Sequence, residues 1–194
     1  MKKVLVTGGT GFLGKPCLPL LLAADYEVHV VTSQSKSDLN TLTLANVIFH
    51  QVDLLSGENN IHNLVVEVQP THLLHLAWCR TLPGKYGNHA DNLRWVESSL
   101  TLFRKFEHFG GKRIVVAGTC MEYDWNYGFC SETQTPLHPN SVYGTCKQSL
   151  QLLLSAFAER TGISTAWGRV FFLYGPHEYE TRLVASVIRS LLKN

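Results

Sequence analysis

The N-terminal segment restricts the fold more than any other part of the chain. Lys3–Thr7 is a β-branched, apolar run of the kind that forms a strand buried on both faces. Gly8, Gly11 and Gly14 follow at intervals of three, and Leu18–Ala24 has the composition of a helix body. Small residues at such a turn let the backbone approach a pyrophosphate, whose charge then lies at the helix N-terminus. The pattern predicts a dinucleotide-binding strand–turn–helix unit, with a plain tight turn as the alternative.

Strand-like and helix-like segments alternate along the whole chain. Such alternation predicts an α/β fold of the Rossmann type, which is a doubly wound parallel sheet with helices on both faces and right-handed crossovers. Ligands of this architecture gather beyond the carboxyl ends of the strands. We expect strands at 3–7, 27–32, 47–50, 72–76, 113–117 and 164–170, and helices at about 12–24, 60–68, 88–108, 141–160 and 181–192.

Size and composition exclude several classes of protein. A chain of 194 residues can bury one good core, so a single domain is the first expectation. The net charge of +2, without a basic run, argues against nucleic acid as a partner. No apolar stretch has the length of a membrane span or of a signal peptide. The five cysteines show no Cys-x-x-Cys pair and no metal spacing, so we expect reduced thiols, a cytoplasmic location and no metal site.

Tyr143 and Lys147 stand four residues apart in a segment expected to be helical. Residues at this spacing share one helix face, so the lysine ammonium would favour the tyrosine phenolate. A free tyrosine, with a pKa of about 10, is a poor base at neutral pH, and a neighbouring positive charge would improve it. Such pairs also occur by chance on helix surfaces. Combined with a dinucleotide site, this one indicates hydride transfer to or from an alcohol or ketone.

These two patterns resemble the extended branch of the short-chain dehydrogenase/reductase family. Thr7–Gly14 (Thr-Gly-Gly-Thr-Gly-Phe-Leu-Gly) matches its phosphate loop, and Pro136–Lys147 (Pro-Leu-His-Pro-Asn-Ser-Val-Tyr-Gly-Thr-Cys-Lys) looks like the start of its active-site helix. The family places Ser or Thr four residues before a tyrosine at the end of the preceding strand, and Thr119 occupies that position. The resemblance implies that Tyr143 is the acid/base, that Lys147 lowers its pKa and binds the nicotinamide ribose, and that Thr119 orients the substrate.

Further segments match the family in chain order. Val52-Asp53-Leu54 follows the third strand, where the family's Asp meets the adenine, and His75-Leu76-Ala77-Trp78 resembles the segment beside the cofactor. Arg169–Pro176 resembles the segment that leads to the substrate. His75 itself is expected to be a buried core histidine. The cofactor-binding residues implied by the resemblance are Gly8, Gly11, Phe12, Leu13, Gly14, Ser33, Asp53, Leu54, Leu76, Ala77, Tyr143 and Lys147.

The cofactor is expected to be NADP or NAD. In NAD-binding members the second strand ends in an acidic residue that binds the adenosine ribose hydroxyls. Here the corresponding stretch, His29–Lys36, has no carboxylate, while Ser33, Ser35 and Lys36 could contact a 2′-phosphate. The sequence therefore favours NADP, although the stretch contains no arginine to decide it.

Other departures from the family concern the chemistry at the substrate. Dehydratases of the family carry Asp-Glu directly after the Thr, whereas Cys120 and Met121 stand there in this chain. Glu122 comes one position late and would face the other way on a regular extended backbone. Reduction or epimerisation is therefore favoured over loss of water. Cys120 and His177 are candidates for a proton-transfer pair, against the plainer interpretation as a buried thiol and a surface imidazole. Phe172 stands where many relatives have Asn on the sugar nucleotide.

Extended members of the family continue well beyond the length of this chain. The resemblance therefore implies an NAD(P)-binding Rossmann domain over 1–176 and the start of a shortened substrate-binding region over 177–194. The chain as given is expected to bind cofactor but to turn over nucleotide sugars poorly, with apolar surface exposed near 183–192. Arg80–Gly87 is expected to form part of the substrate wall.

The activity implied by the resemblance is NAD(P)-dependent hydride transfer at a sugar carbon of a nucleotide-activated sugar, as an epimerase or reductase. The alternative is a Rossmann protein that binds the cofactor without catalysis, as a truncated relic or a regulatory partner. The helix over 150–158 is apolar almost all round, so one side should face the sheet and the other needs cover. In the family that cover is the partner's equivalent helix, which implies a homodimer.

Overall fold

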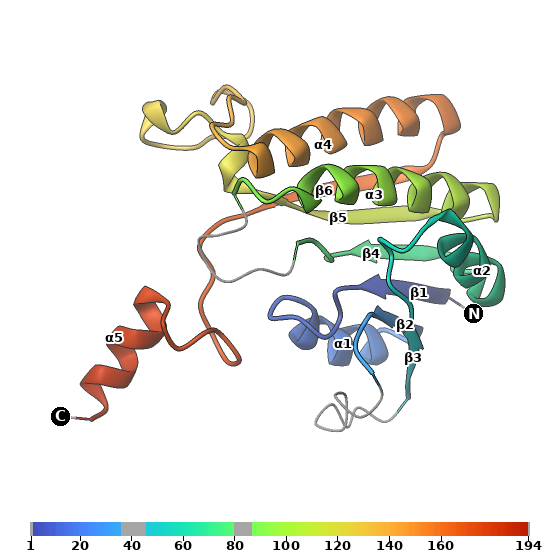
Figure 1. Ribbon diagram of the computed structural model, residues 1–194, viewed down its shortest axis with the longest axis horizontal. Helices are drawn as coiled ribbons and strands as arrows, with labels where there is room; N and C mark the ends of the chain where they lie inside the picture. The colour runs from blue at the N-terminus through green and yellow to red at the C-terminus, as the bar shows by residue number, and fades with distance from the viewer. Residues whose placement is uncertain (1, 36–45, 80–86, 194) are drawn as a thin grey trace.

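The computed structural model describes residues 2–35, 46–79 and 87–193 (Figure 1). At its centre lies a six-stranded sheet with the strand order β3-β2-β1-β4-β5-β6, in which every neighbouring pair is parallel. The strands are β1 (Lys2–Thr7), β2 (Tyr26–Thr32), β3 (Val47–Gln51), β4 (His72–His75), β5 (Arg113–Thr119) and β6 (Ser164–Val170). The helices are α1 (Gly14–Ala23), α2 (Glu58–Val68), α3 (Asp91–His108), α4 (Val142–Thr161) and α5 (Leu183–Leu191), with 3₁₀ turns η2 (Cys120–Glu122) and η3 (Trp125–Tyr127).

Helices cover both faces of this sheet, as the sequence predicted. In Figure 1, α3 and α4 lie along one face, and α1 lies on the opposite face. Successive side chains of β1 point to opposite faces of the sheet: Leu5 belongs to one buried cluster, while Val4 and Val6 belong to the other. The α/β, Rossmann-type fold is therefore confirmed. Each expected helix and strand is present, and the largest difference in a bound is at α3, which begins at Asp91 rather than at 88.

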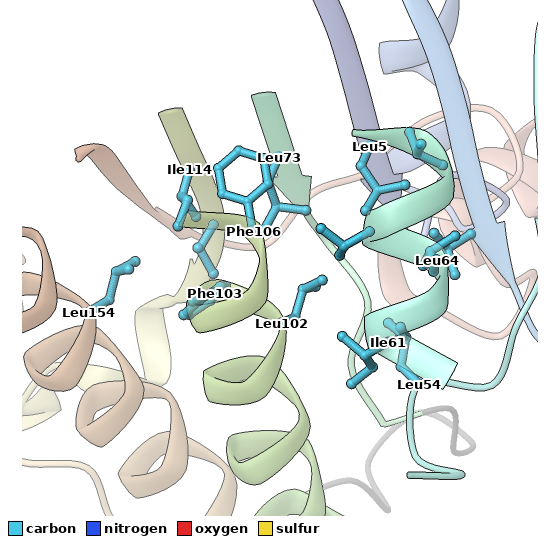
Figure 2. Packing of buried hydrophobic residues seen from close by; sticks show 14 of the residues in the cluster. Leu5, Leu54, Ile61, Leu64, Leu73, Leu102, Phe103, Phe106, Ile114 and Leu154 are labelled. Atoms are coloured by element: carbon cyan, nitrogen blue, oxygen red, sulfur yellow. The ribbon is translucent and has the colours of Figure 1, made fainter. Parts of the chain in front are cut away.

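The larger cluster fills the space between the sheet and α2, α3 and α4 (Figure 2). Strand residues such as Leu73 and Ile114 meet the aromatic rings of Phe103 and Phe106 from α3. The smaller cluster joins β1 and β2 to Leu18 of α1. Burial of these apolar side chains removes their surface from water, which is the main force that holds the layers together.

Apolar surface remains uncovered on two helices. Leu150 and Leu154 of α4 are buried, but Leu152 and Leu153 are 57% and 47% exposed. No residue of α5 is buried, and in Figure 1 this helix stands apart from the layered body. The exposed apolar surface expected near 183–192 is therefore present. No helix within the described residues combines the length and the apolarity that crossing a bilayer requires.

Candidate active site

The turn after β1 is packed too closely to carry side chains. Gly8 has a positive φ of 72°, and a Cβ placed on it would lie 2.7 Å from the backbone nitrogen of Ala77. A Cβ on Gly14 would collide with the carbonyl oxygen of Gly8. That oxygen instead accepts a hydrogen bond from the backbone N–H of Gly11 at 3.0 Å, which closes the turn. Only glycine satisfies both the conformation at the first position and the close approach at the second.

The helix that follows this turn offers a site for an anion. No side chain caps the N-terminus of α1, and its first turn carries no acidic residue. The N-terminal N–H groups of a helix attract negative charge through their unpaired donors and the helix dipole. A close glycine turn in front of such a helix fits a dinucleotide pyrophosphate. The residues present are therefore suited to the cofactor that the sequence predicted.

The order of the strands reverses beside the glycine turn, because β1 pairs with β2 on one side and with β4 on the other. The ends of β1 and β4 are tied together there: Leu76 N donates to Thr7 O at 3.1 Å, and Ala77 N donates to Thr7 Oγ1 at 3.2 Å. Open parallel sheets bind ligands at this kind of reversal. Thr7 therefore fixes the segment that runs beside the expected cofactor.

The buried side chain of His75 also links β4 to Thr7 at the end of β1. Its Nδ1 lies 2.8 Å from Thr7 Oγ1, and its Nε2 lies 2.9 Å from Ser99 Oγ. Because Ser99 donates its own hydrogen to Trp95 O at 2.6 Å, it accepts from the Nε2–H of the imidazole. Burial, with a smaller contribution from the charge of Lys147, lowers the pKa of His75 to about 3 and keeps the ring neutral. His75 is thus the buried core histidine that the sequence predicted.

A pocket of about 250 Å³ opens at the carboxyl ends of β1, β4, β5 and β6. Among the predicted residues, three expected catalytic side chains and three further cofactor contacts lie on its wall. They are Thr119, Tyr143 and Lys147 in the first group, and Phe12, Leu13 and Leu76 in the second. The remaining wall consists of Trp78, Cys79, Ala117, Gly118, Cys120, Met121, Val170, Phe171, Phe172, Leu173 and Arg182.

Lys147 enters the pocket from α4 and is almost completely buried, at 2% exposure. Its Nζ donates to Ala117 O at 2.9 Å and lies 3.8 Å from the centre of the Trp78 ring. Burial lowers the pKa of Lys147 to about 7, while the charge of Glu122 acts in the opposite direction. The ammonium therefore lies in the poorly hydrated part of the pocket, on the same helix as Tyr143.

Thr119 is held on the pocket wall by the turn that follows β5. Its Oγ1 accepts a hydrogen bond from Met121 N at 3.2 Å, and Glu122 Oε1 accepts one from Thr119 N at 2.8 Å. The start of α4 rests directly on this turn, because a Cβ on Gly144 would lie 2.6 Å from Met121 O. Tyr143 N also donates to Gly87 O at 2.8 Å. These contacts place Tyr143 and Thr119 on one wall.

Glu122 does not follow the extended path that the sequence suggested. The extended backbone ends at Thr119, and η2 folds Glu122 back into the protein, where it is completely buried. Its carboxylate accepts from Trp167 Nε1 at 3.1 Å and from Arg169 Nε at 2.7 Å. The regular extended backbone on which the sequence argument placed Glu122 is therefore not present, because the 3₁₀ turn η2 begins at Cys120, two residues earlier. Glu122 is nevertheless absent from the pocket wall, which carries Cys120 and Met121 instead.

The other predicted cofactor residues lie away from this pocket. Ser33 is exposed just past the end of β2, and Lys36 lies outside the described residues. Asp53 is exposed after β3, and its Oδ1 accepts a hydrogen bond from Leu55 N at 2.9 Å. Leu54 is 5% exposed and belongs to the larger buried cluster. Their contacts with a cofactor stay predictions.

The proposed proton-transfer pair is not brought together in the pocket. Cys120 lines the wall, and burial raises the pKa of its thiol. His177 is exposed and is not part of the wall. Phe172 does line the pocket, at the place where the family pattern led us to expect a substrate contact. Arg80–Gly87, the expected substrate wall, is outside the described residues apart from Gly87.

One group of side chains in the described residues has donors that a metal could use. Ligand atoms of Cys79, His89 and Asp91 lie within 4.8 Å of one another. Two of these side chains already have partners: His89 Nδ1 accepts from Asp91 N at 3.2 Å, and Asp91 Oδ1 accepts from Arg94 at 3.0 Å. All five cysteines of the chain are free.

Several parts of the pocket were not identified from the sequence. Trp78 was read only as part of a segment beside the cofactor, yet its ring covers Lys147. The size of this side chain was the available signal. Arg182 brings a second cation to the wall from the segment before α5, and no pattern in that segment marked it.

Comparison with known proteins identifies the family of the chain. A family model described as "NAD dependent epimerase/dehydratase family" matches residues 4–194. The dTDP-6-deoxy-L-talose 4-dehydrogenase (NAD(+)) of Aggregatibacter actinomycetemcomitans is 25% identical over 188 residues, which cover 96% of this chain and 67% of that protein. A UDP-glucose 4-epimerase of Neisseria meningitidis serogroup C is 29% identical over 168 residues, which cover 80% of this chain and 48% of that one.

A solved structure has the same fold. UDP-N-acetylglucosamine 4-epimerase from Methanobrevibacter ruminantium M1, in complex with UDP-N-acetylmuramic acid, matches with a TM-score of 0.80 at 25% identity. The match covers 99% of this chain and 63% of that one. The chain therefore spans between 48% and 67% of the length of these three proteins.

Proposed function

Because the chain belongs to the NAD dependent epimerase/dehydratase family, we propose that it oxidises or reduces a sugar carbon of a nucleotide-activated sugar, as an epimerase or reductase. The observation that carries the proposal is one pocket wall shared by Thr119, Tyr143 and Lys147 with Phe12 and Leu13 of the glycine turn. The names of the two curated relatives both refer to position 4 of a sugar, so we place the reaction at that carbon.

The bound nicotinamide would supply the hydride acceptor or donor. Tyr143 would take the proton from the reacting sugar hydroxyl, or return it to the carbonyl, through its phenolic oxygen. The charge of Lys147 on the same helix face would stabilise the phenolate and so bring the pKa of Tyr143 towards the working range. Thr119 would donate a hydrogen bond to the same substrate oxygen and hold it near Tyr143. Lys147 would also bind the nicotinamide ribose.

The pocket suggests how a nucleotide sugar would lie. Its wall is mainly apolar, and besides Lys147 the cation on it is Arg182, whose side chain is 40% exposed. Arg182 has a distant ion pair with Glu178, at 4.0 Å, so its donors could turn to another partner. We propose that Arg182 contacts the diphosphate and that Phe172 packs against the sugar or the base. This arrangement gives residues 177–194 a part in substrate binding, beside a cofactor domain over 1–176.

We propose NADP or NAD as the cofactor. The family description and the name of one relative refer to NAD. The end of β2 favours NADP, since Ser33 is exposed there and none of the residues from Val28 to Ser35 is acidic. A 2′-phosphate would meet no carboxylate at that end of the strand. We therefore propose a modest preference for NADP.

Two further proposals concern the state of the protein. Leu152 and Leu153 leave an apolar stripe on α4, which we propose is covered by the same helix of a second copy in a homodimer. The five free cysteines are consistent with a reducing, cytoplasmic location, which we keep as a proposal.

The deciding experiment follows the nicotinamide absorbance with purified protein and a panel of dTDP- and UDP-activated hexoses, 4-keto sugars included. Calorimetry with NAD and NADP is run in parallel. A net change in the nicotinamide absorbance with a member of the panel would indicate a reductase, whereas inversion at carbon 4, detected in the NMR spectrum of the sugar and without a net absorbance change, would indicate an epimerase. Tight cofactor binding without hydride transfer to or from any sugar would instead support the non-catalytic alternative.

A further inference from the structure

The ring of Trp78 contacts both members of the tyrosine–lysine pair. The Nζ atom of Lys147 lies 3.8 Å from the ring centroid, over the face of the indole. The ring of Tyr143 meets the same indole edge-on, with centroids 6.4 Å apart and an angle of 67° between the planes. An ammonium above an indole face is attracted by the ring quadrupole, and tryptophan gives the strongest such contact among the aromatic residues.

The indole is itself fixed by its neighbours. Trp78 Nε1 donates to Asn92 Oδ1 at 2.8 Å, and Asn92 is completely buried at the start of α3. Asn92 Nδ2 donates in turn to His89 O at 2.9 Å. Trp95, one turn further along α3, stacks on the indole with ring centroids 6.0 Å apart. Trp78 is therefore a rigid surface, to which a flexible lysine side chain can be fitted.

Lys147 has few other partners for its charge. None of the ion pairs in the described part of the chain includes Lys147, and its hydrogen bond goes to the neutral carbonyl of Ala117. Among the described residues, the titratable groups around it include Glu122 from η2, His75 from β4 and Tyr143 on α4 itself, with Cys79, Cys120 and Arg182 on the same pocket wall. The carboxylate of Glu122 is engaged by Arg169 at 2.7 Å, and His75 is neutral in the core. Besides the carbonyl of Ala117 at 2.9 Å, the indole face at 3.8 Å is thus the group in contact with Lys147 Nζ that favours the charged form.

We propose that Trp78 is a positioning residue for the reaction, which holds the Lys147 ammonium charged and aimed at Tyr143. This inference rests on the proposed function, in which that charge makes Tyr143 an effective acid/base. Burial lowers the pKa of Lys147 and so disfavours its charge. The quadrupole of the Trp78 ring attracts the ammonium and so acts in the opposite direction. Without the indole, Lys147 would lose both its orientation and part of its affinity for the proton.

The test reads Lys147 directly and needs no substrate. ¹H–¹³C spectra are recorded over a pH series on protein that carries ¹³Cε-labelled lysine, and the signal of Lys147 is assigned by its loss in Lys147→Met. In the unchanged protein the ring current of Trp78 should move the ε protons of Lys147 upfield of every other lysine. Unshifted ε protons would overturn the proposal without any variant.

Substitution then measures the contribution of the ring. Trp78→Leu should lower the pKa of Lys147 by about one unit and abolish the upfield shift. Trp78→Phe keeps an aromatic face and should retain most of both. Trp95→Leu is the matched control, since it removes an equal ring that touches Trp78 but not Lys147, and it should leave the pKa of Lys147 in place. A pKa that stays constant or rises in Trp78→Leu would overturn the proposal, because that is the result of admitting water alone.

The pH profile of hydride transfer supplies the functional readout. With less charge on Lys147, the pKa of Tyr143 should rise, so the limb of the kcat/KM profile that reports the phenolate should move to higher pH in Trp78→Leu and not in Trp95→Leu. If no sugar is turned over, the proposed function fails while the resonance of Lys147 still tests the contact. If turnover occurs and that limb stays in place, the positioning role fails while the function stands.

Discussion

Arg169 Nε donates to Glu122 Oε2 at 2.7 Å, and this contact joins the ends of the neighbouring strands β5 and β6 beneath the pocket. The carboxylate is completely buried, and it also accepts from the backbone N–H of Thr119 at 2.8 Å. The buried carboxylate of Glu122 therefore binds both Arg169 on β6, the last strand of the sheet, and the backbone of Thr119, which we expect to contact the substrate.

Removing that carboxylate should destabilise the protein strongly. Glu122→Ala leaves the guanidinium of Arg169 and the N–H of Thr119 without their buried partner, and we expect a loss of about 3–5 kcal/mol in the free energy of unfolding. The double variant Glu122→Leu with Arg169→Leu should lose less than the single variant, because no unpaired charge remains. Urea denaturation measures both. A single variant as stable as the original would mean that the pair contributes nothing.

Tyr143→Phe should reduce hydride transfer by at least about a hundredfold while leaving cofactor affinity nearly unchanged. The phenyl ring can keep its edge contact with Trp78, and only the proton carrier is lost. Tyr127→Phe, at a tyrosine that is 60% exposed and absent from the pocket wall, serves as the control and should retain full activity. Substantial turnover by Tyr143→Phe would exclude Tyr143 as the acid/base.

Gly11→Val should weaken dinucleotide binding by about tenfold or more, equivalent to 1.4 kcal/mol. Gly11 is exposed at the turn, and the added side chain would occupy the space in front of α1 that the phosphates need. Gly168→Val is the matched control, because a Cβ at that position of β6 meets no atom within 4 Å. Calorimetry that finds equal affinity in a folded Gly11→Val protein would contradict the phosphate-loop interpretation.

NADP should bind more tightly than NAD by about 1 kcal/mol, and Thr32→Asp should reverse the order. Thr32 is the last residue of β2, and its Oγ1 accepts a hydrogen bond from Gln34 N at 3.1 Å, which a carboxylate oxygen could also accept. The added charge would accept from the ribose hydroxyls and repel a 2′-phosphate. Competition binding of the two cofactors gives the ratio, and tighter binding of NAD by the original chain would refute the preference.

His75 should make the protein less stable in acid. Its folded pKa of about 3 lies below the unfolded value of 6.5, so between these values the unfolded chain binds a proton that the folded one does not. Its contribution is fully present above pH 6.5, and the free energy of unfolding should fall by about 1.4 kcal/mol for each pH unit below it. In His75→Gln this component should disappear, which denaturation at pH 7.5 and pH 5 can measure. Parallel losses in both proteins would contradict the assignment.

The sequence was sufficient for the fold because its signals are local and repeated. Buried parallel strands are continuous apolar runs, and each element from Lys2 to Leu191 carried such a run or a helical pattern. The assembly of Thr119, Tyr143 and Lys147 was predictable for a related reason, since the end of one strand and the start of the next helix must meet at the same edge of the sheet.

The failures concern contacts between segments far apart in the chain. The direction of Glu122 depended on a turn of three residues and on Arg169, which lies on another strand. The contact of Trp78 with Lys147 depended on how α4 packs against the end of β4. Neither the direction of Glu122 nor the contact of Trp78 with Lys147 leaves a periodic pattern in the sequence. The residues could therefore be read from the sequence, but their contact partners could not.

The missing side chain at Gly144 has a consequence for the evolution of the site. At this residue α4 packs directly against Met121 O. This contact, rather than the length of the connecting segment, therefore sets the position of Tyr143. The connection between η3 and α4 can therefore gain or lose residues among related proteins without moving the phenol. A larger residue at position 144 would displace the phenol even in a chain of unchanged length.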